Sequence, residues 1–94
     1  MADLLSDQEI EARLGGSEWT REGEMIVRSW KFDDFAAALA FVNRVGEAAE
    51  EANHHPDILL HGWNNVKLSL TNHSAGGLTA VDFEMAGRFD DLAG

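Results

Sequence analysis

The sequence predicts an α+β fold in which three helices and four strands alternate in the order αββαββα. Three observations predict it: a long helical pattern mid-chain, a pair of short alternating segments on either side, and capping signals near both ends. Together they favour a four-stranded antiparallel sheet with helices packed on one face. With 94 residues and no linker, a single domain over residues 1–94 is expected.

The first third of the chain predicts a short helix followed by a β-hairpin. Ser6 and Glu9 have the spacing of a capping box, which starts a helix, and Gly15 is suited to end it. Alternating apolar and polar residues then indicate two strands around a tight turn at Gly23. The expected bounds are 7–14 for the helix, and 18–21 and 25–32 for the strands.

The longest helix is expected over residues 34–52, with Asp33 as its N-cap. Apolar residues recur there at intervals of three and four, as on the buried face of an amphipathic helix. The residues predicted to form this core face are Phe35, Leu39, Val42, Val45 and Ala49.

The last third predicts a second hairpin and a final helix. Strands are expected over 58–63 and 66–71, joined through Asn64 and Asn65, with the alternate residues Val66, Leu68 and Leu70 facing the core. Thr79 and Asp82 repeat the capping-box spacing, so a helix should follow to about residue 91.

Composition excludes several classes of protein. The net charge of −10 and the lack of a basic stripe argue against binding nucleic acid or an anionic membrane. There is no cysteine, and no apolar run approaches the ~20 residues of a membrane span. The start of the chain is acidic where a secretion signal would be basic, so a soluble cytoplasmic protein is expected.

Three of the four histidines fall at positions that can converge, and carboxylates accompany them. His54, His55 and His73 stand near Glu50 and Asp82 in the predicted fold. Imidazole has an unperturbed pKa of ~6.5, so such a group is suited to acid/base chemistry or to metal binding. Adjacent histidines point apart, and no His-x3-His pair is present, so we expect no metal site.

The string Glu50-x3-His54-His55-Pro56-x6-Trp63-x9-His73-x8-Asp82 resembles the signature of the pterin-4a-carbinolamine dehydratases. The αββαββα order and the early Trp19 are also similar to that family. The resemblance implies that the chain removes water from a 4a-hydroxytetrahydropterin to give quinonoid dihydropterin. It implies neither a metal nor an organic cofactor, and it places the reaction in tetrahydropterin recycling, after an aromatic amino-acid hydroxylase.

The resemblance also implies roles for individual residues. His54 and His73 become the acid/base pair, and His55 orients the pterin; Glu50 is expected to support His54, and Asp82 to support His73. Four positions are assigned to substrate binding, although Thr79 also fits an N-cap and Trp19 a core aromatic: Asn53, Pro56, Trp19 and Thr79.

The chain departs from the family pattern at two positions and leaves one histidine outside it. Asn53 stands where the family often has Asp, and Val81 stands where animal members have Arg. A cationic contact to the ligand is therefore not expected from position 81. His61 lies outside the signature and is expected to be structural or solvated.

Two other classes of function stay open. Family members form dimers or tetramers, so self-association through a sheet edge or a helix face is expected here. Animal members also bind a transcription factor, which allows a protein-interaction module. Some bacterial relatives assist Rubisco assembly, and these have lost the catalytic histidines that this chain retains.

Overall fold

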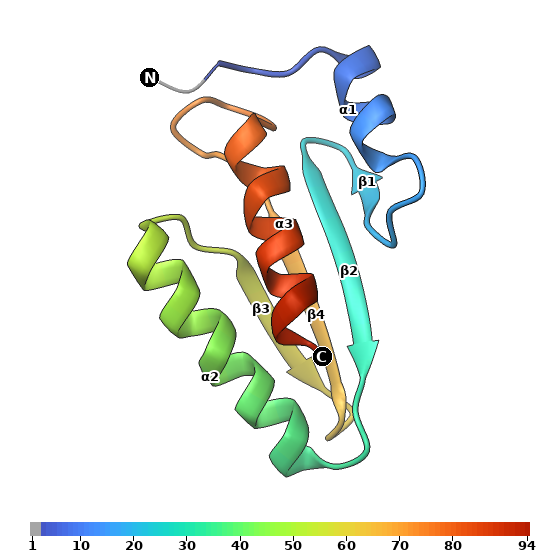
Figure 1. Cartoon of the computed structure of the whole chain (residues 1–94), viewed down its shortest axis with the longest axis vertical. Helices are drawn as coiled ribbons and strands as arrows, with labels where there is room; N and C mark the ends of the chain where they lie inside the picture. Colours follow the sequence, from blue (N-terminus) through green and yellow to red (C-terminus); the bar gives the residue numbers. More distant parts are fainter. Residues whose placement is uncertain (1–2) are drawn as a thin grey trace.

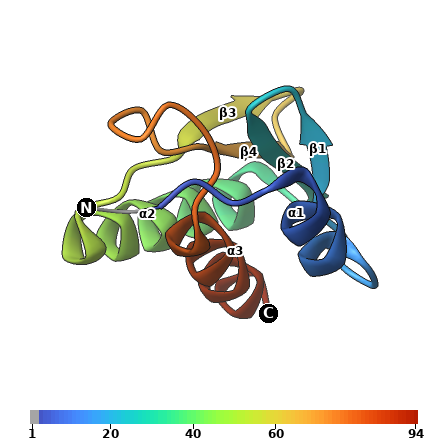
Figure 2. The same cartoon turned by 90° about the horizontal axis from the view of Figure 1, so that it is seen from above.

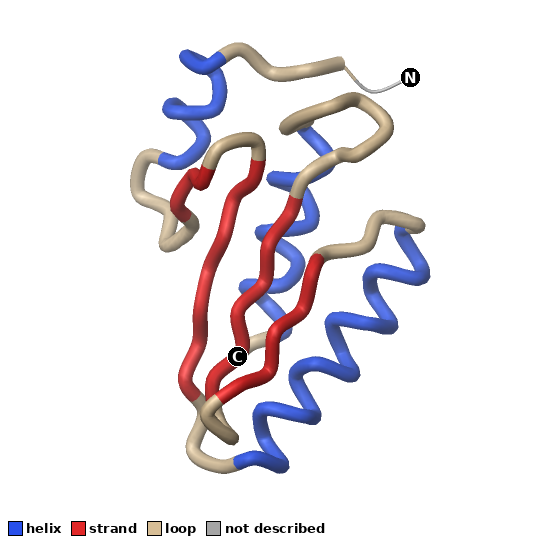
Figure 3. The backbone as a smooth tube through the Cα atoms, turned by 180° about the vertical axis from the view of Figure 1, so that it is seen from behind, coloured by secondary structure: helices blue, strands red, loops and turns tan. Residues whose placement is uncertain are grey.

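The computed structural model describes residues 3–94 and confirms the predicted αββαββα fold. Four antiparallel strands form one sheet in the order β1-β2-β4-β3 (Figure 1). All three helices lie on the same face of the sheet (Figure 2), and Figure 3 shows the opposite face with no helix of the described chain over it. The elements are α1 Asp7–Leu14, β1 Thr20–Glu22, β2 Met25–Lys31, α2 Phe35–Ala52, β3 Asp57–His61, β4 Asn65–Leu70 and α3 Ala80–Leu92.

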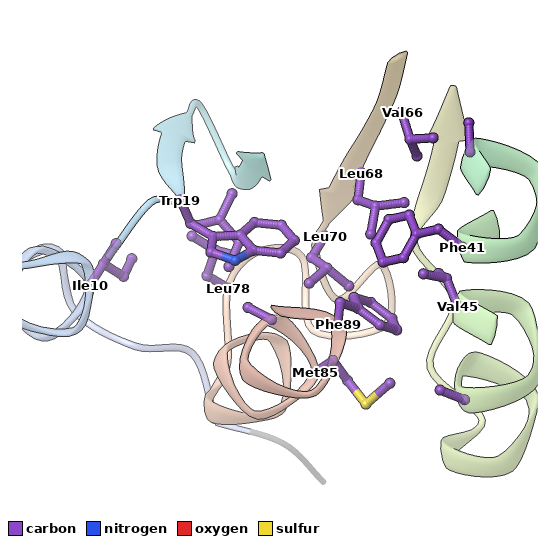
Figure 4. Packing of buried hydrophobic residues seen from close by; sticks show 14 residues of the cluster. Ile10, Trp19, Phe41, Val45, Val66, Leu68, Leu70, Leu78, Met85 and Phe89 are labelled. Carbon is purple, nitrogen blue, oxygen red and sulfur yellow. The ribbon is translucent and has the colours of Figure 1, made fainter. Parts of the chain in front are cut away.

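The core lies between β4 and the two long helices. Val66, Leu68 and Leu70 of β4 alternate toward the helices and are fully buried, which confirms the predicted alternation. Side chains from α2 and α3 meet them, among them Phe41 and Phe89 (Figure 4). β4 therefore provides hydrophobic contacts that hold both α2 and α3 against the sheet.

The predicted core face of α2 is partly wrong. Phe35 and Leu39 are 49% and 41% exposed, whereas Ala38 and Phe41 are fully buried. The first two turns of α2 carry apolar residues on every side, so their spacing does not specify which side is buried.

No helix within residues 3–94 is long and apolar enough to span a bilayer.

The turn between β3 and β4 also differs from the prediction. It runs through Gly62, Trp63 and Asn64, and both Gly62 and Trp63 have positive φ, at 55° and 60°. A tryptophan in this left-handed region is strained, because its Cβ approaches the backbone. Asn64 holds the turn through Phe32, whose N–H donates to the Asn64 carbonyl at 2.8 Å and whose carbonyl accepts the Asn64 side-chain amide at 2.8 Å.

The helix caps show how local sequence sets the element bounds. The capping box of α1 is confirmed, since the Ser6 N–H donates to Glu9 and the Glu9 N–H to the Ser6 hydroxyl. The Ser6 backbone and side-chain hydrogen bonds hold the pKa of Glu9 below its usual value. α2 is capped by Asp34, not by the predicted Asp33: its carboxylate accepts the Ala37 N–H at 2.7 Å.

Asp90 ties the end of α3 to the sheet. One carboxylate oxygen accepts the indole N–H of Trp19 at 2.8 Å and a guanidinium N–H of Arg28 at 2.8 Å. Trp19 is buried, and Asp90 is the one acceptor that its indole N–H has within residues 3–94. Arg28 also lies over the ring of Trp30, 4.7 Å from the ring centroid.

We expect Asp90→Ala to lower the free energy of unfolding by about 1–3 kcal/mol, because it leaves the buried indole N–H of Trp19 without an acceptor. Urea denaturation followed by tryptophan fluorescence measures this. Asp91→Ala is the matched control, since it removes the same charge from an exposed neighbouring side chain. Equal urea midpoints for the two variants would contradict the role given to Asp90.

Candidate active site

The end of α2 places His54 by a left-handed cap. Asn53 has φ 52° and ψ 42°, which turns the chain out of the helix. The His54 N–H then donates back to the Ala49 carbonyl at 3.1 Å, as in a Schellman-type ending. Because backbone hydrogen bonds fix this turn, the imidazole leaves the helix end in a defined direction.

His54 contacts a fully buried carboxylate. Its Nε2 lies 2.6 Å from Oδ1 of Asp82, whose side chain has no exposed surface, while the side chain of His54 is 13% exposed. The second oxygen, Oδ2, accepts the Thr79 N–H at 2.9 Å and lies 3.4 Å from the Thr79 hydroxyl. The Asp82 carboxylate thus completes the capping box at the start of α3 and also binds the imidazole of His54.

His55 forms a second imidazole–carboxylate pair, at the surface. Its Nε2 contacts Oε2 of Glu50, one turn back along α2, and both side chains are more than half exposed. A solvent-exposed pair is worth little to stability, because water screens it. The pair still restrains the His55 ring beside His54.

The carboxylates therefore pair with different histidines from those that the sequence indicated. Glu50 was expected to support His54 and contacts His55 instead; Asp82 was expected to support His73 and contacts His54. The Asp82 contact joins the start of α3 to the end of α2, and local spacing carries no information about that junction.

His73 comes from the loop between β4 and α3. β4 ends next to the start of β3, where Ser69 pairs with Asp57, so His73 and His55 extend from neighbouring strand ends. The two loops lie at the same end of the sheet (Figures 1 and 2). His73 is exposed and has no hydrogen-bond partner among residues 3–94. Next to it, Asn72 shapes the loop by accepting the Ala75 N–H at 3.1 Å.

The four positions assigned to substrate binding separate into two groups. Asn53 is exposed and Pro56 half-buried, and both flank the histidine pair. Trp19 and Thr79 are buried. Trp19 also binds Asp90, eight residues after Asp82 on α3, which is about 12 Å along the helix axis. The structure does not bring Trp19 to the histidines.

The sequence interpretation missed the N-terminal strap, residues 3–5, which runs beside the start of α3. Leu4 forms an isolated antiparallel bridge with Thr79, and the Leu5 N–H donates to the Leu78 carbonyl at 2.9 Å. An open pocket of about 500 Å³ lies between the strap and residues 79–81, and Val81 lines it. No local motif marks the strap, because it pairs with residues more than seventy positions away.

The comparison that decides the family covers nearly the whole chain. The family model described as "Pterin 4 alpha carbinolamine dehydratase" matches residues 3–92. The chain belongs to this family.

Individual members of the pterin-4-alpha-carbinolamine dehydratase family confirm the resemblance. A relative in Natronomonas pharaonis, named provisionally as such a dehydratase, is 44% identical over 99% of both chains. One in Roseiflexus sp., with the same provisional name, is 50% identical over 98% of this chain and 99% of its own.

Solved structures agree with the family and with the fold. A crystal structure of a transcriptional coactivator/pterin dehydratase from Brucella melitensis has a TM-score of 0.91 and 33% identity, covering 98% of this chain and all of that one. A pterin dehydratase-like protein identified as a RuBisCO assembly factor in the alpha-carboxysome has a TM-score of 0.70 and 28% identity, covering 82% of this chain and 90% of its own.

In this member of the pterin-4-alpha-carbinolamine dehydratase family, His54 and His55 are paired with carboxylates. Within residues 3–94, no three His, Asp or Glu side chains converge into a set that could hold a metal ion. His54 and His55 instead each contact one carboxylate through Nε2. A carboxylate on one ring nitrogen orients an imidazole and fixes which nitrogen carries the hydrogen.

Proposed function

We propose that the chain removes water from a 4a-hydroxytetrahydropterin and releases quinonoid dihydropterin. Family membership supports the substrate class. The observation that carries the proposal is the 2.6 Å contact between His54 Nε2 and the buried Asp82 carboxylate. It resembles the carboxylate–imidazole pairs that hold a general base in other enzymes.

The reaction needs one proton given and one proton taken. The C4a–O bond breaks as the hydroxyl oxygen accepts a proton and leaves as water. The neighbouring ring nitrogen loses its proton to a base, and the electrons of that N–H bond form the new C=N bond. Positioned acids and bases typically accelerate such steps 10²–10⁴-fold.

His54 is proposed as the base. An ionised carboxylate only accepts hydrogen bonds, so Nε2 of His54 carries the hydrogen that faces Asp82. Nδ1 then keeps its lone pair, and it has no hydrogen-bond partner among residues 3–94. That nitrogen is available to accept the proton from the pterin ring.

His73 is proposed as the acid, and His55 as the residue that orients the pterin. His73 is exposed on the neighbouring loop and can exchange protons with water. His55 is held by Glu50 next to His54, where it can hydrogen-bond a flat heterocycle. Asn53 and Pro56 complete the substrate contacts in this proposal.

The direct test is dehydration of freshly generated 4a-hydroxytetrahydropterin, followed by absorbance in metal-free buffer with a chelator. The expected result is a rate well above the spontaneous one, unaffected by the chelator. A wild-type rate equal to the spontaneous one would overturn the proposed function. A rate lost on chelation would overturn the metal-free mechanism.

In the cell, this activity would serve an aromatic amino-acid hydroxylase in the cytoplasm, and the active chain would be a homodimer or homotetramer. Two surfaces support self-association. β3 is an edge strand, and pairing it antiparallel with a second copy about Leu59 sets Asp57 opposite His61. The exposed Phe35 and Leu39 of α2 offer the second surface.

We expect Leu39→Glu or Leu59→Glu to weaken the association between copies of the chain. Each variant replaces an apolar side chain, 41% exposed at Leu39 and 53% exposed at Leu59 in the single chain, with a charged one. Sedimentation equilibrium measures the mass against 10.3 kDa for one chain. Leu4→Glu, at another exposed leucine, is the matched control and should leave the mass unchanged. A wild-type mass of one chain would contradict self-association.

A protein-interaction module is the second candidate function. The observation that favours it is Trp63, which is 61% exposed at the β3–β4 turn with a strained backbone. Strain of this kind concentrates at functional sites, and exposed tryptophans are frequent anchors of interfaces. The Brucella and RuBisCO-assembly neighbours carry such functions in their names. If a His54 variant without dehydratase activity still performs its cellular role, the binding function is favoured.

A further inference from the structure

Three hydrogen-bond donors surround the buried carboxylate of Asp82. The Thr79 N–H reaches Oδ2 at 2.9 Å, the Thr79 hydroxyl lies 3.4 Å from the same oxygen, and His54 Nε2 reaches Oδ1 at 2.6 Å. Two of the three donors belong to Thr79. This threonine therefore determines much of the environment of the carboxylate that binds His54.

Thr79 has no exposed surface, so it cannot contact a pterin directly. Its own position is fixed from the other side by the N-terminal strap, through the Leu4–Thr79 bridge and the hydrogen bond from Leu5 to the Leu78 carbonyl. A buried threonine held on both sides can act on the reaction only through its neighbours.

We propose that Thr79 is a positioning residue, which orients His54 through the carboxylate of Asp82. The torsion that rotates an aspartate carboxylate is broad, so rotamer preference alone does not fix the plane of its two oxygens. The backbone N–H of Thr79 at 2.9 Å and its hydroxyl at 3.4 Å both face Oδ2, and together they fix that plane and so direct Oδ1 at the imidazole. The proposal rests on the proposed dehydration, because it concerns the base of that reaction.

The experiment compares Thr79→Val, which keeps the shape and removes the hydroxyl, with Thr79→Ser, which keeps the hydroxyl. Thr20→Val is the matched control, at an exposed threonine of β1. Losing the 3.4 Å hydroxyl contact while the backbone N–H stays on Oδ2 should lower kcat about two- to threefold with little change in KM. Thr79→Ser should restore the wild-type kcat, and Thr20→Val should not change it.

A second readout does not depend on activity. The ¹⁵N shifts of the imidazole ring report how the hydrogen is shared between Nδ1 and Nε2 of His54. In Thr79→Val the ring signals should move toward a mixture of tautomers or broaden, and in Thr79→Ser they should match wild type. A wild type without dehydratase activity would overturn the proposed function, while the ring signals would still decide the role of Thr79.

Two results would overturn the positioning role. One is a folded Thr79→Val with wild-type kcat and wild-type His54 ring signals. The other is a Thr79→Ser that folds but does not restore them. If Thr79→Val does not fold, Thr79→Ala replaces it, since alanine removes the same hydroxyl from a smaller side chain and leaves the backbone N–H to Asp82 in place.

Discussion

His54→Gln is expected to reduce dehydration of 4a-hydroxytetrahydropterin about 10²–10⁴-fold, toward the spontaneous rate. Glutamine keeps an N–H that can reach the Asp82 oxygen now bound by His54 Nε2. It offers no basic nitrogen for the pterin proton. The variant should therefore fold and bind pterin while losing the proton-transfer step, so the loss should appear in kcat more than in KM.

Glutamine is a sharper test than alanine at this position. His54→Ala would leave the fully buried Asp82 carboxylate without one of its hydrogen-bond donors, which lowers stability. A loss of activity in that variant could then come from unfolding and not from the missing base. His61→Gln is the matched control, since it makes the same change on an exposed histidine at the end of β3. Because His61 also lies on the proposed β3 contact between copies, sedimentation equilibrium first shows that this variant keeps the wild-type mass. If His54→Gln retains the wild-type rate, His54 is not the base.

Elements with a two-residue period or a cap motif could be predicted from the sequence. On β4, every second residue is a large aliphatic, so only one strand orientation buries all three. The Ser6–Glu9 and Thr79–Asp82 spacings each marked a helix start, because cap hydrogen bonds are local. The buried side of α2 was predicted correctly at Val45 and Ala49 but not in its first turns, where Ala38 is buried while Phe35 stays exposed.

The sequence indicated histidines and carboxylates that prove to be in contact, but not which of them contact one another, and their role in a site stays a prediction. His54, His55, Glu50 and Asp82 do form imidazole–carboxylate pairs. Which carboxylate meets which imidazole depends on how α3 packs beside the end of α2, and that packing results from the whole core. Trp19 was grouped with the site because of its family position, although its indole binds Asp90 instead.

Asp82→Asn is expected to preserve the fold and remove most of the activity, with a loss of about 10²–10⁴-fold. An amide has one oxygen and one NH2 group in place of two oxygens. The oxygen must face Thr79, because a backbone N–H has no alternative to donating. The NH2 group then faces His54 and donates to Nε2, which moves the imidazole hydrogen to Nδ1.

The amide variant therefore separates the two roles of this side chain. Its oxygen keeps the hydrogen bond from the Thr79 N–H, and the N3 position of a capping box accepts an amide side chain, so stability should stay near wild type. The nitrogen proposed to take the pterin proton now carries a hydrogen, so the base is lost. The analogous amide change in a serine protease triad leaves the geometry intact and lowers kcat about 10⁴-fold.

Two measurements decide the outcome: kcat, and the ¹⁵N signals of the His54 ring, which should show the hydrogen on Nδ1 in Asp82→Asn and on Nε2 in wild type. Asp91→Asn, at an exposed carboxylate of the same helix, should change neither. Asp82→Ala should lose both stability and activity, since it removes the cap as well as the partner of His54. An Asp82→Asn protein with wild-type kcat and the hydrogen still on Nε2 would show that the Asp82 carboxylate only caps α3. It would then have no part in the proton transfer.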